Sequence, residues 1–362
     1  MIKVLHSELQ SNIGGIESFL LNLTKSMDMT NIHFDMLMRG NNPYLENELK
    51  GLGVTIYKVP TNSLQYSKFI KKLLEENNYD FVHVHKNSAA NILLPIMVKK
   101  YSHAKLIVHS HNTSPSSGSK IAIALHKLNR SRLYKLSDFR FACSDTAAEW
   151  MFGKDYQNKD VKIIKNGIIA QDYVYNPEVR TKMREQLGLT GKFVIGHVGA
   201  FREQKNHKFL LKVFSELDDP NAELVLVGDG PLKREVKAQA KKLGITNKIQ
   251  FLGSRNDVNK LLQAFDVFVM PSLWEGLSIS TIEAQASGLP LILSNKISRL
   301  TQITDDVEFI SLYNIFDWVA AIEKVKDKFE RKNNLPKIIL NGYDIKKSSR
   351  KIYDTYTGGE LI

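Results

Sequence analysis

Two glutamates, Glu275 and Glu283, stand eight positions apart on either side of a Gly-Leu-Ser turn. An apolar run at residues 266–270 leads into this turn, and a helix-like segment at residues 280–287 follows it. A buried strand that ends in a glycine turn and opens into a helix directs backbone N–H groups and the positive helix end at one spot, which suits phosphate. Carboxylates accept hydrogen bonds from hydroxyl groups such as those of a sugar. The pattern therefore predicts a nucleotide-sugar site.

Glu283 also has a purely structural interpretation. Residues 280–283 read Ser-Thr-Ile-Glu, which fits a capping box in which the glutamate folds back onto the first residue of a helix. Glu275 precedes a glycine in a turn and has no comparable structural role.

Basic residues follow the predicted strand at residues 193–199. Arg202 and Lys205 lie three positions apart after Gly199, and such a pair can offset the charge of a diphosphate. The alternative is surface salt bridging, with Glu203 nearby.

Two further loops follow predicted strands of the same half. At residues 225–231 a strand leads into Gly228-x-Gly230, but the third glycine of the dinucleotide fingerprint is absent, which argues against a nicotinamide cofactor. Asp257 and Val258 precede a helical segment and could present a carboxylate and backbone groups to a base. The alternative for Asp257 is that it caps this helix.

Strand ends in the first half also carry polar groups. A glycine pair at residues 14–15 lets the backbone approach a ligand at a helix start, although an ordinary tight turn explains it as well. Period-2 spacing places paired histidines on one face of a strand, and imidazole can bond both sugar hydroxyls and phosphate. Hydrogen-bonded histidines at strand ends are the alternative, and a metal site ranks third because no thiolate cluster or carboxylate partner accompanies them. These histidines are His83, His85, His109 and His111.

Length and composition limit the class of protein. The 362 residues suffice for two domains, 43% of them are hydrophobic, and no apolar run is long enough to span a bilayer. The first residues favour a strand over a secretion signal, and the single cysteine, Cys143, excludes an intramolecular disulfide, so we expect a cytoplasmic protein.

The formal net charge is +12, and the basic residues occur in clusters. Residues 121–135 alternate apolar residues with cations, as in a basic amphipathic helix that lies on an anionic membrane, so we expect peripheral association with the inner face of the cell membrane. The alternative is a solvated helix face. No nucleic-acid motif is present, and the sequence leaves the oligomeric state open.

Short β-rich runs alternate with helical patterns along both halves of the chain. This alternation predicts parallel sheets covered by helices on both faces, in two successive α/β repeats. In open α/β sheets ligands bind beyond the carboxyl ends of the strands, where the residues above would lie. The predicted strands are residues 2–5, 32–37, 54–59, 81–85, 105–109, 139–143, 161–164, 193–199, 222–227, 249–252, 266–270 and 289–293.

Over essentially its whole length the chain resembles the family 4 retaining glycosyltransferases, and more narrowly bacterial exopolysaccharide and capsule enzymes. The most specific motif is the pair Glu275 and Glu283 within Pro-Ser-x-x-Glu-Gly, and the ordered set is more specific than any member. The other matching segments are residues 14–17, 109–112, 166–168, 204–207, 228–231 and 342–345.

The resemblance implies the GT-B architecture, two facing Rossmann-like domains with an interdomain cleft. Residues 1–166 with a returning C-terminal helix at 345–362 would form the acceptor-side domain, and residues 167–344 the nucleotide-sugar-binding domain. The implied activity is transfer of a hexose or N-acetylhexosamine from a nucleoside diphosphate sugar, UDP-linked, to a glycan on a polyprenyl diphosphate, with retention of configuration. No cofactor or metal is implied, and the sequence contains no Asp-x-Asp triplet.

The resemblance also implies roles for individual residues. Glu275 would contact the hydroxyls of the donor sugar, Glu283 the ribose, and Lys205 the diphosphate. His109, or else His111, would lie near the sugar or acceptor, with His109 preferred. The further donor-site residues would be Gly15, Gly199, Gly228, Asp257, Val258, Gly276, Leu277 and Ser278.

One departure concerns the diphosphate. Many relatives carry arginine directly after the glycine that matches Gly199, where this chain has Ala200 and offers Arg202 two positions later.

Three alternatives remain open: a nucleotide-sugar epimerase, a glycan phosphorylase, or a non-catalytic glycosyltransferase-like partner subunit.

Overall fold

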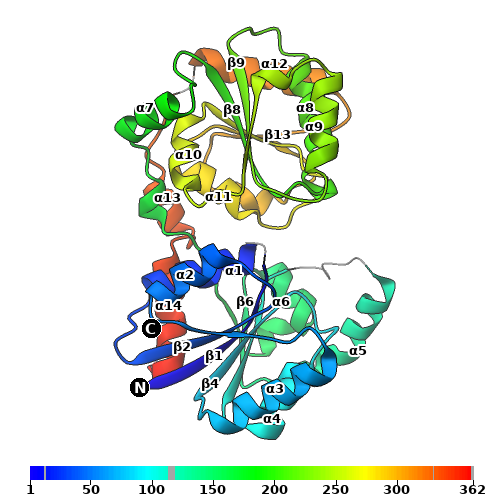
Figure 1. The fold of residues 1–362 in the computed structure, drawn as a ribbon, viewed down its shortest axis with the longest axis vertical. Coiled ribbons are helices and arrows are strands. Elements are labelled where there is room, and N and C mark those ends of the chain that lie inside the picture. Colours follow the sequence, from blue (N-terminus) through cyan, green and yellow to red (C-terminus); the bar gives the residue numbers. More distant parts are fainter. Residues whose placement is uncertain (12–13, 113–118, 329, 360–362) are drawn as a thin grey trace. The chain divides into compact units, whose positions relative to one another are not determined.

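The computed structural model describes residues 1–11, 14–112, 119–328 and 330–359. The chain divides into two compact units, residues 1–168 with 344–362, and residues 169–343. The boundaries expected from the sequence, 166 and 345, lie within two residues of these. Each unit contains one parallel sheet with helices on both faces (Figure 1), which confirms the predicted fold class of two Rossmann-like domains.

The first unit is built on a seven-stranded sheet in the order β3-β2-β1-β4-β5-β6-β7. Its strands are β1 (Ile2–Leu9), β2 (Ile32–Met38), β3 (Thr55–Lys58), β4 (Phe81–Lys86), β5 (Lys105–Ser110), β6 (Phe139–Ala142) and β7 (Val161–Ile163). Its helices are α1 (Gly15–Ser26), α2 (Pro43–Gly51), α3 (Ser63–Glu76), α4 (Leu93–Tyr101), α5 (Lys120–Leu136), α6 (Asp145–Phe152) and α14 (Ile345–Thr357).

The second unit has a six-stranded sheet in the order β10-β9-β8-β11-β12-β13. Its strands are β8 (Phe193–Val198), β9 (Ala222–Val227), β10 (Ile249–Gly253), β11 (Val267–Met270), β12 (Leu291–Ser294) and β13 (Val307–Ile310). Its helices are α7 (Pro177–Gln186), α8 (His207–Ser215), α9 (Lys233–Lys242), α10 (Val258–Ala264), α11 (Ile279–Ala286), α12 (Ile315–Lys328) and α13 (Leu335–Leu340). The predicted strands omit β13, because its side chains mix exposure and burial and form no apolar run.

In each sheet the order in which strands are added reverses at a corresponding place. In the first, the chain moves outward from β1 to β3 and then returns to pair β4 with β1; in the second, β11 pairs with β8 in the same way. Such topological switch points are where open α/β sheets bind ligands. The loops after β1, β4, β8 and β11 are therefore expected to carry ligand-binding residues.

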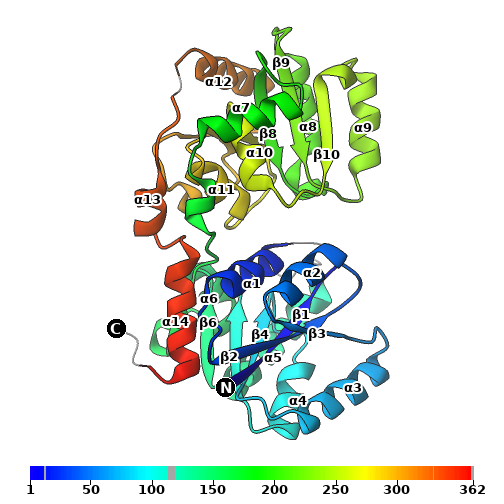
Figure 2. The same cartoon turned by 60° about the vertical axis from the view of Figure 1, so that its left-hand side comes forward.

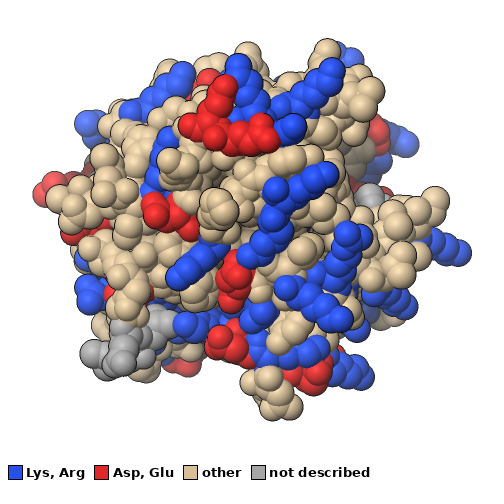
Figure 3. Space-filling view, turned by 90° about the horizontal axis from the view of Figure 1, so that it is seen from below, with Lys and Arg blue, Asp and Glu red and all other residues tan. Residues whose placement is uncertain are grey.

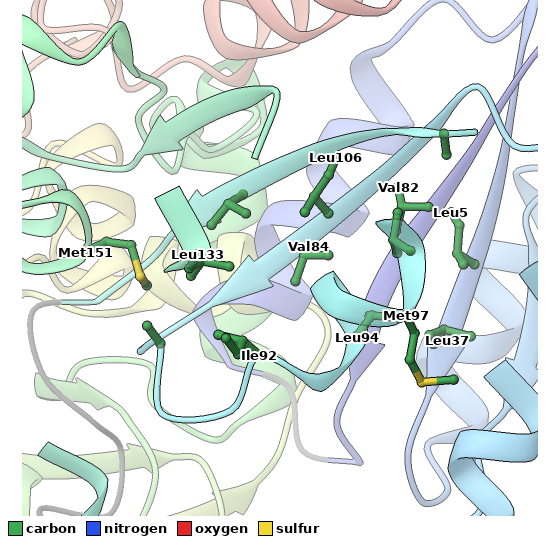
Figure 4. Packing of buried hydrophobic residues seen from close by; sticks show 14 of the residues in the cluster. Leu5, Leu37, Val82, Val84, Ile92, Leu94, Met97, Leu106, Leu133 and Met151 are labelled. Carbon is green, nitrogen blue, oxygen red and sulfur yellow. The ribbon is translucent and has the colours of Figure 1, made fainter. Parts of the chain in front are cut away.

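The two faces of the first sheet differ in chemistry because alternate residues of a strand point to opposite faces. One face is aliphatic and packs against α3, α4, α5 and α6 (Figure 4), with Leu5, Val82 and Leu106 among its buried residues. The opposite face carries His6, His83 and other imidazoles. The alternation of the strands thus separates an aliphatic core from a buried polar layer.

The C-terminal helix α14 belongs to the first unit, where it packs against α1 (Figure 2). A backbone bridge joins Ile168 to Asp344, and a Cβ placed on Gly167 would come within 2.7 Å of the Ile345 backbone. Tyr356 on α14 bonds through its hydroxyl to Nδ1 of His83 at 2.6 Å. The close approach at Gly167 and the hydroxyl contact hold the returning helix on the imidazole face of the sheet.

Candidate active site

In the second unit the loop after β8 packs tightly against the loop after β9. The N–H of Gly199 donates to the carbonyl of Val227, and the N–H of Phe201 donates to that of Asp229, at 2.9 and 3.0 Å. A Cβ on Gly228 would come within 2.2 Å of the Gly199 carbonyl oxygen. Gly228, predicted to bind substrate, therefore has a structural reason to be glycine that involves no ligand.

Lys205 and Glu275 meet at the switch point of the second sheet. The Lys205 Nζ lies 2.7 Å from Oε1 of Glu275, although the residues are far apart in sequence. Both side chains are largely buried, with exposed fractions of 15% and 9%. The structure thus joins the residue predicted to hold the diphosphate to the residue predicted to hold the sugar.

Backbone and side-chain hydrogen bonds fix these two loops to each other. The Leu273 N–H donates to the Gln204 carbonyl at 2.8 Å, and the Gln204 side-chain amide donates to the Trp274 carbonyl at 3.0 Å. Lys205 and Glu275 each lie one residue beyond these contacts. Because both loops are held at several points, the ion pair is part of a fixed arrangement.

Two imidazoles that the sequence interpretation did not assign lie next to Lys205. His197 Nδ1 donates to the Val269 carbonyl at 2.8 Å, and its Nε2 is buried without a partner among the described residues. His207 stacks on Phe201. Burial lowers the pKa of His197 to about 4 and that of His207 to about 2, so both stay neutral. The position of His197 two residues before a strand-end glycine was the only available signal.

The turn after Glu275 leaves backbone donors open. Helix α11 begins at Ile279, and its N-cap residue Ser278 makes no side-chain cap. Within the described residues, the N–H groups of Gly276, Leu277 and Ser278 have no acceptor. Open N–H groups before a helix N-terminus attract an anion, as the sequence predicts.

Glu283 lies inside α11, so the capping-box interpretation is wrong: the helix begins four residues before it. Its Oε1 accepts a hydrogen bond from the Tyr173 hydroxyl at 2.8 Å. Burial raises the pKa of Glu283, and the tyrosine hydroxyl lowers it in part. The second carboxylate oxygen has no partner among residues the structure describes, and remains available to a ligand. Tyr173 was not predicted, since it lies in the linker before α7.

Asp257 is the N-cap residue of α10 but does not cap it through its side chain. Its carboxylate instead pairs with Arg255 at 2.8 and 2.6 Å, and this guanidinium lowers the pKa of Asp257. The helix-capping alternative is therefore wrong. Val258, the first residue of α10, is partly buried.

Arg202 is not part of the Lys205–Glu275 arrangement. Its side chain is exposed and borders a cavity of about 350 Å³ that Glu203 and His207 also line, and that neither Lys205 nor Glu275 reaches. No ion pair joins Arg202 to Glu203 in the described part of the chain. The surface salt bridge weighed as its alternative is therefore not formed either.

In the first unit, the loop after β1 is held by Glu17. The buried carboxylate accepts the N–H groups of Gln10 and Gly14 at 2.9 and 3.0 Å. Gly15 begins α1 in an exposed position, and a Cβ placed on it would meet nothing within 4 Å. Packing against the described residues does not require glycine here, and the Gly15 backbone is exposed.

His109, the preferred substrate contact, lies in the interior of the first unit, and neither of its ring nitrogens has a partner among the described residues. His109 is fully buried, and Phe19 of α1 packs on its ring at 5.3 Å between centroids. His111 is partly exposed, but its Nδ1 bonds to Asn166 Oδ1 at 2.9 Å and its Nε2 to His85 Nδ1 at 2.8 Å. Both nitrogens of His111 are thus used within the chain, as the alternative of hydrogen-bonded histidines predicts.

A line of hydrogen bonds connects the imidazoles of this unit. His85 Nε2 bonds to His6 Nδ1 at 3.0 Å, which extends the line from Asn166 through His111 and His85. Two overlapping groups of three, His6 with His83 and His85, and His85 with His109 and His111, bring ring nitrogens within 4.8 Å. His85 belongs to both groups, yet both of its nitrogens already bond to other rings.

Comparison with known proteins places both units in glycosyltransferase families. Residues 13–172 match the family described as Glycosyltransferase Family 4, and residues 179–339 match Glycosyl transferases group 1. The chain is 33% identical over 308 residues to the putative glycosyltransferase EpsF of Bacillus subtilis, covering 82% of this chain and 80% of the relative.

Two further relatives are matched over nearly their whole length. The UDP-Gal:alpha-D-GlcNAc-diphosphoundecaprenol alpha-1,3-galactosyltransferase of Escherichia coli is 25% identical, over 98% of this chain and 96% of its own. The capsular polysaccharide biosynthesis glycosyltransferase CapH of Staphylococcus aureus is 26% identical over the whole of both chains. Among solved structures, Anabaena Alr3699/HepE in complex with UDP and glucose superposes with a TM-score of 0.82 at 19% identity, covering 99% of this chain and 100% of that one.

Proposed function

The chain belongs to the family 4 glycosyltransferases of the GT-B fold, and from this premise we propose that it transfers a hexose or N-acetylhexosamine from a UDP-sugar to a lipid-linked glycan in polysaccharide synthesis. Retention of anomeric configuration is part of the proposal. The observation that carries it is the contact between Lys205 and Glu275 beside open backbone N–H groups at the switch point of the second sheet. The donor and acceptor classes follow those in the names of the E. coli and Anabaena relatives.

Charge at this switch point suits a departing diphosphate. As the bond from sugar to diphosphate breaks, negative charge grows on the leaving oxygen, and preorganised donors near that position lower the barrier. The Lys205 ammonium and the N–H groups of Gly276, Leu277 and Ser278 supply these donors. Because cationic and amide groups meet the charge, the proposed reaction needs neither a metal ion nor another cofactor.

Carboxylates of the second unit would orient the rest of the donor. Glu275 would accept hydrogen bonds from the sugar hydroxyls, and the unpartnered oxygen of Glu283 from the ribose. The Tyr173 hydroxyl holds the Glu283 carboxylate in one orientation. Residues Asp257 and Val258 would meet the base, and Gly199 would line the donor site. In the first unit, Gly15 stays a predicted substrate-binding residue.

Donor binding is the first test. Calorimetric titration with UDP should give a measurable heat, and a panel of nucleotide sugars should reveal slow hydrolysis of one of them. The panel requires no knowledge of the acceptor. Absence of heat with every nucleoside diphosphate would favour a non-catalytic partner subunit, and epimer formation from donor alone would favour an epimerase.

We further propose that α5 rests on an anionic membrane surface at the inner face of the cell membrane. Exposed apolar residues on α5, Ile121 at 74% and Leu128 at 75%, stand among exposed cations such as Lys127. The helix contains no acidic residue. Seen from below (Figure 3), the molecule shows more Lys and Arg than Asp and Glu. In the described chain no helix has the length and apolar character needed to cross a bilayer.

Vesicle co-sedimentation tests the membrane proposal. Binding should increase with the anionic lipid content of the vesicles and weaken in Ile121→Ser and Lys127→Glu. The control Lys241→Glu makes the same charge change on α9 of the second unit and should leave binding unchanged. Equal binding to neutral and anionic vesicles would contradict the proposal.

A further inference from the structure

The ion pair between Lys205 and Glu275 raises a question about the two nucleotides that this site would meet. The donor carries a sugar on its diphosphate, whereas the product UDP does not. A diphosphate that takes the Lys205 ammonium removes the ionic partner of Glu275. Whether Glu275 then gains new hydrogen-bond partners depends on whether the ligand carries a sugar.

Glu275 has few other partners. Its side chain is 9% exposed, and its remaining hydrogen bond to another side chain is a long one from the Ser272 hydroxyl, at 3.4 Å. A carboxylate left buried without its cation is costly, because neither water nor a counter-ion stabilises its charge. Hydroxyl groups of a donor sugar would meet this need, and UDP alone would leave it unmet.

Contacts between the two loops keep Lys205 and Glu275 close to each other. Gln204 bonds to the backbone of Leu273 and Trp274, so the two loops stay at the same separation. The Lys205 Nζ also lies 3.9 Å from the Met270 sulfur, and His197 and His207, whose pKa values burial lowers, are close enough for its charge to lower those pKa values further. An imidazole is neutral or cationic and never anionic here, so neither histidine offers Lys205 a second counter-ion. Glu275 is thus the acidic group that competes with a diphosphate for this ammonium.

We propose that Glu275 makes the donor site discriminate against the product: it competes with UDP for Lys205, and stops competing when a donor sugar engages its carboxylate. This inference rests on the proposed function of the site. After transfer, the freed carboxylate pairs with Lys205 again and promotes release of UDP. A residue that binds the donor sugar is therefore also one that weakens binding of the product.

The test compares UDP binding by calorimetry in the wild type, in Glu275→Gln and in the control Glu203→Gln. The amide keeps the shape of Glu275 and removes its charge. UDP should bind Glu275→Gln about 10-fold more tightly, the factor that corresponds to about 1.4 kcal/mol. Glu203 is exposed in the same loop and its amide removes the same charge, so UDP affinity should stay within about twofold there.

Product inhibition provides a second measurement with the donor that the hydrolysis panel identifies. The ratio of the UDP inhibition constant to the donor KM should fall about 10-fold in Glu275→Gln, because UDP gains affinity and the donor does not. Thermal unfolding checks that the variant folds, and Glu275→Ala replaces it if it does not.

The possible failures are distinguishable. Unchanged or weaker UDP binding in Glu275→Gln, with the wild type binding UDP, would overturn the competition while the proposed function stands. Failure of the wild type to bind UDP would instead contradict the proposed function on which the inference rests.

Discussion

The two units place polar side chains at the same topological position and use them in opposite ways. In the first unit, His6, His85 and His111 bond to one another beneath α1. In the second, Lys205 and Glu275 form an ion pair beside open backbone donors. The first arrangement is neutral and buried, and it leaves nitrogens of His6, His83 and His109 without a partner among the described residues, whereas the second holds charges that a ligand can exchange. Shared topology therefore does not imply shared chemistry, and the second unit is the one in which we propose that the donor binds.

The largest expected difference between the two units is the loss of stability at acidic pH. Burial lowers the pKa of His83, His85 and His109 well below the usual value, that of His6 to about 3 and that of His111 to about 4. The unfolded chain binds more protons below about pH 6.5, so stability falls as the pH drops through this range. Each neutral imidazole adds at most about 1.4 kcal/mol of loss per pH unit.

The first unit holds these five imidazoles and His126, whose pKa burial also lowers, and the second unit holds His197 and His207. Hydrogen exchange read by mass spectrometry between pH 7 and pH 5 should show the first unit opening at the higher pH. Earlier opening of the second unit would contradict this comparison.

Loss of the Lys205 ammonium should have the next largest effect. Removing a charged hydrogen-bond partner costs about 1.5–3 kcal/mol, so Lys205→Ala should lower kcat/KM by about 10- to 100-fold. Lys208→Ala is the matched control, since Lys208 lies three residues on, is half exposed and pairs with Glu235. Steady-state kinetics with the identified donor measure both. Turnover like that of the wild type in Lys205→Ala would refute its assignment to the diphosphate.

Loss of the Glu283 carboxylate should reduce kcat/KM about as much as the loss of one charged hydrogen bond. Loss of the Tyr173 hydroxyl that orients this carboxylate should reduce it less. Glu283→Ala should reduce kcat/KM by at least about 10-fold, mainly through a higher donor KM. Tyr173→Phe removes only the hydroxyl that orients the carboxylate, so the loss should be about 3- to 10-fold. If Tyr173→Phe proved more harmful than Glu283→Ala, the order of their roles would be reversed.

Chelation should have the smallest effect. Because Lys205 and backbone N–H groups are proposed to meet the diphosphate charge, donor hydrolysis after dialysis against EDTA should stay within about twofold of the untreated rate. Mg²⁺ added back serves as the control. A large loss that Mg²⁺ restores would show that a metal ion supplies part of the countercharge.

Much of the fold follows from local patterns in the sequence. Strand and helix periodicities predict two parallel α/β units, and the strand-end loops that carry Glu275, Glu283 and Lys205 are recognisable without a structure. These features are local, because each depends on side chains within one strand, one turn or one helix start.

Only the tertiary structure decided how those residues are used. The contact between Lys205 and Glu275 depends on β11 pairing with β8, which joins segments about 70 residues apart, and no periodicity encodes strand order. The burial of His109 depends on Phe19 from α1 in the same way. Partners that are distant in the sequence determine whether a polar side chain faces a ligand or another side chain, and folding alone brings those partners together.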